Sequence, residues 1–169
     1  MEGAEPAVRS GPHSRLPQVL LWLTLAAILF LVVTRVLDRG TKEEGAGLVT
    51  WQPHESAAAA ARSAERPVLY DFTAAWCGPC HRLDAEGWGD PQIASLVNRS
   101  YLPARVVDRE REDGKNPPAI EELERRYSVN AFPTLVVAAP DGRLIAKFQG
   151  YGGREKLLQF LQESSRKTP

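Results

Sequence analysis

The sequence predicts an α/β domain with a mixed β-sheet flanked by helices, preceded by one transmembrane helix. From residue 54 onward, short apolar strands alternate with helical segments, which is typical of parallel strands joined by right-handed crossovers. A turn at 140–143 then joins two strands into a hairpin, which adds an antiparallel edge. Before these elements, an uncharged apolar run begins at Leu16 and ends at Val33.

The apolar run is long enough to cross a bilayer when it is extended to Leu37, since about 20 residues suffice. A secretory signal has a shorter core of about 7–15 residues and a small-residue cleavage site, which this segment lacks. We expect a disordered tail at 1–15, an anchor in the lipid bilayer at 16–37, a flexible linker at 38–47 and one domain at 48–166. Lys and Arg flank the anchor on both sides, so charge leaves its orientation open.

Helix starts and stops justify the elements in order. Proline in the first turn favours helices that begin near 54, 91 and 118, and Asp90 is a good N-cap for the second of these. The expected helices are 54–65, 81–86, 91–99 and 118–127, with a last amphipathic helix after Gly152-Gly153. The expected strands are 68–73, 102–107, 134–138 and 144–148, and the residues 108–116 read as a charged loop.

Composition excludes several function classes. Lys and Arg number 21, as do Asp and Glu, so no excess positive charge favours a nucleic-acid partner. The chain has 2 cysteines, which excludes a multi-disulfide framework and a four-cysteine zinc site. We expect no metal and no cofactor.

Both cysteines lie in one short motif, Trp76-Cys77-Gly78-Pro79-Cys80-His81, between a predicted strand and a predicted helix. The first turn of a helix stabilises a thiolate through its unpaired N–H groups and its dipole. A thiolate is the species that attacks disulfides. The position of Cys77 therefore predicts an exposed nucleophile, and Cys80, one turn further on, would resolve the mixed disulfide.

Asp71 lies on the strand that precedes the cysteines. Burial there would raise the pKa of its carboxyl group and let it exchange the proton of Cys80. The other interpretation is a strand-end residue bonded to nearby backbone. Trp76 is expected to form an exposed platform beside the thiol.

Two segments, VLYDFTAAWCGPCH and YSVNAFPTLVVAAPDGRLIAKFQGY, resemble the two active-site motifs of the thioredoxin superfamily. The segment CHRLDAEGWGDPQIASLV further resembles the C-terminal domain of the transmembrane thiol-disulfide interchange protein of the Dsb system. The resemblance implies a thioredoxin fold, a redox disulfide between Cys77 and Cys80, and a cis peptide before Pro133. It also implies that the backbone of Phe132 pairs with an extended substrate, and that Gly78 and Pro79 tune the potential towards reduction.

The resemblance implies a membrane-tethered thiol-disulfide oxidoreductase that reduces extracytoplasmic proteins at the bacterial inner membrane. Its expected partners are proteins with disulfides and an upstream thiol electron donor, for which a transmembrane thiol reductant is the candidate. Three alternatives stay open: a disulfide oxidase or isomerase, a binding module without turnover, and a c-type haem carrier, because Cys77, Cys80 and His81 also match the haem attachment pattern.

Overall fold

The structure is a computed structural model that describes residues 22–28, 30 and 48–167. The chain divides into two units, 1–43 and 44–169. In the first unit, residues 22–28 are helical and their side chains are exposed. The predicted tail, the predicted linker and most of the predicted anchor lie outside the described residues. Within the ranges that are described, no helix is both long and apolar enough to cross a membrane.

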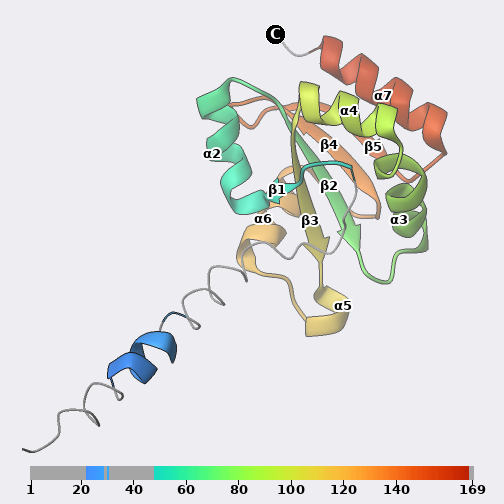
Figure 1. The fold of residues 1–169 in the computed structure, drawn as a ribbon. Coiled ribbons are helices and arrows are strands. Elements are labelled where there is room, and N and C mark those ends of the chain that lie inside the picture. The colour runs from blue at the N-terminus through green and yellow to red at the C-terminus, as the bar shows by residue number, and fades with distance from the viewer. Residues whose placement is uncertain (1–21, 29, 31–47, 168–169) are drawn as a thin grey trace, which may run out of the picture. The chain divides into compact units, whose positions relative to one another are not determined.

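The second unit is built on a mixed five-stranded sheet with the order β1-β3-β2-β4-β5 (Figure 1). Strands β1, β3 and β2 are parallel, whereas β4 and β5 run antiparallel to their neighbours. The strands are β1 (Gln52–Pro53), β2 (Val68–Ala74), β3 (Leu102–Asp108), β4 (Thr134–Ala138) and β5 (Leu144–Gln149).

Helices cover both faces of this sheet. Figure 1 shows α2 (His54–Ala64) and α6 (Pro118–Arg126) on one face and α3 (Gly78–Arg82), α4 (Pro91–Ser100) and α7 (Arg154–Arg166) on the other. Helix α3 continues directly into η1 (Leu83–Trp88), a wider π-helical turn. The short helix α5 (Glu110–Asp113) follows β3. This arrangement confirms the predicted α/β fold with a mixed sheet.

The alternation of side chains along β2 separates two apolar cores. Val68, Tyr70 and Phe72 pack with α2 and α6, whereas Leu69 packs with α4 and α7. By the same alternation, Asp71 points to the face that carries α3 and η1. A carboxyl group therefore enters one of the two cores.

Two elements differ from the sequence prediction. The segment before the first helix forms β1, a strand of only two residues that pairs with β3. The predicted loop 108–116 contains the helical turn α5, which has no buried residue. Neither element shows the periodic spacing of apolar residues from which strands and helices are predicted, because β1 has only two residues and every residue of α5 is charged.

Candidate active site

The disulfide between Cys77 and Cys80 occupies the start of α3, where β2 ends and turns into the helix. Cys77 is the N-cap residue, and the backbone N–H of Cys80 lies 3.2 Å from the Sγ of Cys77. Pro79 stands in the first turn, where its missing N–H costs nothing. The motif thus places the first sulfur against the N–H end of a helix, as the sequence predicted.

Cys77 is only 2% exposed in this oxidised structure. The expectation of an exposed Cys77 is therefore wrong for the disulfide form. Its sulfur is turned inward to bond Cys80, and the partly buried ring of Phe132 packs against the two cysteines and Ala74. A client or an electron donor must reach the sulfur past this ring.

Aromatic side chains surround the disulfide on its outer side. Trp76 is 43% exposed, and its ring meets that of Phe132 edge to face at 5.9 Å between centroids. The peptide bond between Phe132 and Pro133 is cis, as the resemblance implied. The structure thus brings Trp76 and Phe132 together beside the cysteines, whereas Trp88 is buried in the core.

Asp71 lies at the centre of a buried polar cluster. It pairs in register with Arg105 of the neighbouring strand β3, and the Nη2 of Arg105 donates to its Oδ2 at 3.2 Å. The indole Nε1 of Trp88 donates to the same oxygen at 3.0 Å. Arg105 also pairs with Asp84 of η1. The other oxygen of Asp71, Oδ1, is buried and has no hydrogen-bond partner.

Burial raises the pKa of Asp71 to about 6, against the opposing effect of the Arg105 guanidinium. The carboxylate of Asp84 adds to the increase, and the hydrogen bond from Trp88 reduces it. The expected direction is therefore observed, and its main cause is desolvation, as predicted. A carboxyl group with this pKa can both take and return a proton near neutral pH.

Sequence reasoning missed Arg105, which is 6% exposed. Its guanidinium carbon lies 4.5 Å from the ring centroid of Trp51, in the segment that leads into β1. The ring of Trp51 in turn meets that of Trp88 edge to face at 5.3 Å. The sequence feature that could have identified Arg105 is an arginine within a mostly apolar predicted strand, because a buried cation requires a partner.

The remaining residues of the motif lie at the surface. Gly78 and Pro79 are exposed, and the Nε2 of His81 lies 2.9 Å from the carbonyl oxygen of Ala75. In the part of the chain that the structure describes, no three His, Cys, Asp or Glu side chains are placed to hold a metal ion. The reactive groups that β2 and the motif contribute are the two sulfurs and the carboxyl group of Asp71.

Comparison with known proteins places this site in a family. Residues 54–165 match the thioredoxin-like domain. Mitochondrial thioredoxin from Mus musculus is 33% identical over 101 residues, which are 60% of this chain and 53% of that protein. The chain spans about half the length, or less, of the first curated relatives it matches.

Solved structures share the fold. "DsbH Oxidoreductase" superposes with a TM-score of 0.61 at 18% identity, covering 72% of this chain and 87% of that one. The oxidised C-terminal domain of DsbD from Neisseria meningitidis superposes with a TM-score of 0.53 at 21% identity, covering 68% and 99%. The match over residues 54–165 shows that the chain belongs to the thioredoxin-like domain family, and the Cys77–Cys80 disulfide lies within the matched region.

Proposed function

We propose that this protein is a membrane-tethered reductase of disulfides in extracytoplasmic proteins. The observation that carries the proposal is the position of Cys77 at the N-cap of α3, with its sulfur 3.2 Å from the N–H of Cys80. In the reduced protein the same N–H groups stabilise a thiolate at Cys77.

The reaction runs through a mixed disulfide and transfers two electrons. The thiolate of Cys77 attacks one sulfur of the client disulfide, and the other client sulfur leaves as a thiolate and takes up a proton. Cys80, once deprotonated, attacks the Sγ of Cys77 and releases the second client thiol. The client has then gained two electrons and two protons, and the protein carries the Cys77–Cys80 disulfide. An upstream dithiol, for which a transmembrane thiol reductant is the candidate, restores the reduced form.

Asp71 acts as the base for the second step in this proposal. Its Oδ1 is buried and without a partner, and burial raises the pKa of the group to about 6. Arg105 and Trp88 hold the other oxygen, so the carboxyl group keeps one orientation while a proton moves. The proton of Cys80 passes to Asp71, either directly or through a water molecule, and returns to a client thiolate.

The direction of electron flow rests on the residues between the cysteines. Gly78 and Pro79 match the dipeptide of reducing thioredoxins, whereas a disulfide oxidase or isomerase requires a less stable disulfide. Equilibration of Cys77–Cys80 with glutathione measures the potential. A value near about −270 mV supports a reductase, and a value above about −150 mV overturns that direction.

Trapping identifies the clients and tests the reaction together. With Cys80→Ala the second step is blocked, so client proteins should accumulate as mixed disulfides on Cys77 that dithiothreitol releases. The matched control is Cys77→Ser, which retains Cys80 and should trap nothing. Survival of insulin reduction in the Cys77→Ser variant would contradict the mechanism, and a wild-type protein that does not reduce insulin would favour a binding module.

The tether is the segment 16–37, uncharged from Leu16 to Val33, which we propose anchors the domain at the bacterial inner membrane. Its orientation follows from the chemistry, because disulfides persist outside the cytoplasm and not within it. A membrane-impermeant thiol reagent, applied to intact cells after mild reduction, should label Cys77. Labelling only after lysis would overturn the proposed side of the membrane.

A further inference from the structure

A cavity of about 500 Å³ lies beside the disulfide and has no part in the chemistry described above. Trp76 and Phe132 line it, and these are the side chains that flank the cysteines. A volume of this order lies within the range of about 300–1,000 Å³ that is usual for ligand sites. The cavity therefore adjoins the place where a client segment must lie during exchange.

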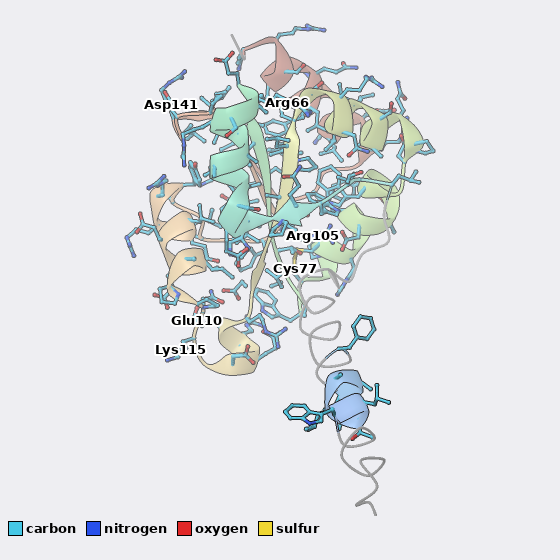
Figure 2. All side chains as sticks on the ribbon, turned by 60° about the vertical axis from the view of Figure 1, so that its left-hand side comes forward. Arg66, Cys77, Arg105, Glu110, Lys115 and Asp141 are labelled. Atoms are coloured by element: carbon cyan, nitrogen blue, oxygen red, sulfur yellow. A yellow bond between two sulfur atoms is a disulfide. The ribbon has the colours of Figure 1, made fainter. Side chains whose placement is uncertain are left out.

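The sheet register explains why the cavity adjoins the motif. Ala74 at the end of β2 pairs with Asp108 at the end of β3, so the chain leaves both strands at one edge of the sheet. The cysteine motif follows the first strand and α5 follows the second. Cys77 and Glu110 accordingly come from adjacent strand ends (Figure 2).

The wall of the cavity is acidic. Carboxylates come from Asp108, Glu110 and Glu124, whereas Arg111 is the single Lys or Arg among the lining residues. The guanidinium carbon of Arg111 lies 3.6 Å from the ring centroid of Trp76, on the side of the cavity towards the motif. Three carboxylates thus face one guanidinium.

Two of these carboxylates share one amide donor. Asp108 is 5% exposed, and the side-chain amide of Asn116 donates to its Oδ2 and, at 3.4 Å, to the Oε2 of Glu124. The other oxygen of Glu124, Oε1, is buried and has no partner. Burial, followed by the charge of Asp108, raises the pKa of Glu124.

The cavity wall is also fixed in place. The backbone N–H of Arg109 donates to the Oδ1 of Asn116 at 2.7 Å, and the Nε of Arg109 donates to Asp113 at 2.7 Å. These bonds close the segment around α5 onto itself. The backbone that carries Asp108 and Glu110 is thus held before a client arrives, which lowers the entropic cost of binding.

We infer that this cavity selects clients by receiving a lysine or arginine side chain that lies within a few residues of the client's disulfide-bonded cysteine. The inference rests on the proposed function and names the substrate class of the same site. An ammonium or guanidinium group would satisfy the free Oε1 of Glu124 and offset the excess of negative charge. The aliphatic part of the same side chain would pack on Trp76 and Phe132.

Matched disulfide peptides test the inference. The peptides differ at a single position near the cysteine, which carries lysine, glutamine or glutamate, and kcat/KM for reduction is measured with each. We expect the lysine peptide to exceed the glutamine peptide by about five- to tenfold at low salt, and the glutamate peptide to be the slowest. The ratio of kcat/KM for the lysine peptide to that for the glutamine peptide should fall towards one in about 1 M salt, where the Debye length is about 3 Å.

Protein variants then locate the preference in the cavity. Glu110→Gln and Glu124→Gln should each lower the ratio of kcat/KM for the lysine peptide to that for the glutamine peptide to about twofold or less. The matched control is Glu112→Gln, which removes an equal charge from α5 at an exposed residue that does not line the cavity. It should leave the ratio unchanged. Glu110 is exposed, so its variant stays informative even where Glu124→Gln does not fold.

The outcomes separate this inference from the function on which it rests. Equal reduction of all three peptides by the wild-type protein overturns the selectivity and leaves the reductase intact. An equal loss of preference in the Glu112→Gln control shows a general surface charge effect and also overturns it. Failure to reduce any peptide rejects the reductase, and the inference is rejected with it.

Discussion

Asp71 and Arg105 are direct neighbours on adjacent parallel strands, and the guanidinium of Arg105 donates to the carboxyl group of Asp71 at 3.2 Å. Both side chains are almost fully buried. A buried pair of this kind contributes little net stability, because desolvation opposes the attraction. Its consequence is electrostatic control, since Arg105 decides how far burial can raise the pKa of Asp71.

Replacement of Asp71 tests the pH dependence of stability. The folded protein holds the proton of Asp71 with a pKa of about 6, compared with 3.8 for an unperturbed group. The folded state therefore binds more protons than the unfolded state in this window, and stability falls as pH rises from about 4 to about 6. Asp71→Asn removes this pH-dependent loss. The free energy of unfolding of the variant, relative to that of wild type, should therefore increase by up to about 3 kcal/mol when the pH is raised from 4 to 8.

Urea unfolding of the oxidised proteins at both pH values measures this difference. Asp108→Asn is a useful comparison, because it also removes a buried carboxylate, but one outside the Asp71 cluster. A stability difference between Asp71→Asn and wild type that stays constant with pH would show that Asp71 does not titrate in this range.

Loss of the cation at Arg105 should raise the pKa of Asp71 above about 6, because the guanidinium is the main influence that lowers it. We also expect Arg105→Met to cost about 3–5 kcal/mol at a pH where Asp71 is ionised, because its carboxylate would then be buried without a cation beside it. The cost should be smaller at low pH, where the carboxyl group is neutral. NMR titration of the Asp71 carboxyl carbon gives the pKa, and Arg105→Lys is the charge-conserving control.

A glycine in η1 allows the turn to pack closely. A Cβ atom at Gly87 would lie 2.7 Å from the Cδ2 of Leu157 and 2.8 Å from the Cδ1 of Leu83, both of which belong to the core. Gly87→Ala should therefore destabilise the protein by about 1–3 kcal/mol in thermal or urea unfolding. At Gly78 a Cβ would meet nothing within 4 Å. Gly78→Ala should accordingly change stability by less than about 1 kcal/mol, and an equal cost at both positions would contradict the steric argument.

We expect access to the disulfide to depend on Phe132, which packs against the cluster of Ala74, Cys77 and Cys80. Phe132→Ala should expose the Sγ of Cys77 and raise the rate at which dithiothreitol reduces the disulfide, by about threefold or more. Phe132→Leu keeps most of the apolar cover and should give an intermediate rate. Stopped-flow measurement of tryptophan fluorescence can follow the reaction, and an unchanged rate in Phe132→Ala would show that another group limits access.

Most of the fold could be predicted from the sequence because its signals are local. Proline in the first turn marks α4 and α6, and mostly apolar segments of five to seven residues mark β2, β3 and β4. The strand β1 could not be predicted in this way, since its two residues are held only by pairing with β3. Helix α5 likewise has no buried face that would give an apolar period.

The site was predictable to a similar extent. The motif around Cys77 predicted the helix start, and the one charged residue of β2 drew attention to Asp71. The partnership with Arg105 depends on sheet register, because 34 positions separate the two residues in sequence. The burial of Cys77 depends on its disulfide with Cys80 and on the packing of Phe132, which is distant in sequence. Neither can be read from local patterns.

The contact between Trp51 and Arg105 has a practical consequence for anyone who truncates this protein. The family match begins at residue 54, which invites expression of a fragment that starts there. Such a fragment would lack the indole that lies 4.5 Å above the guanidinium, together with Val49, which is part of the core. Solvent would then reach the buried ion pair, so a soluble fragment should begin at or before residue 48 if its redox behaviour is to represent the intact chain.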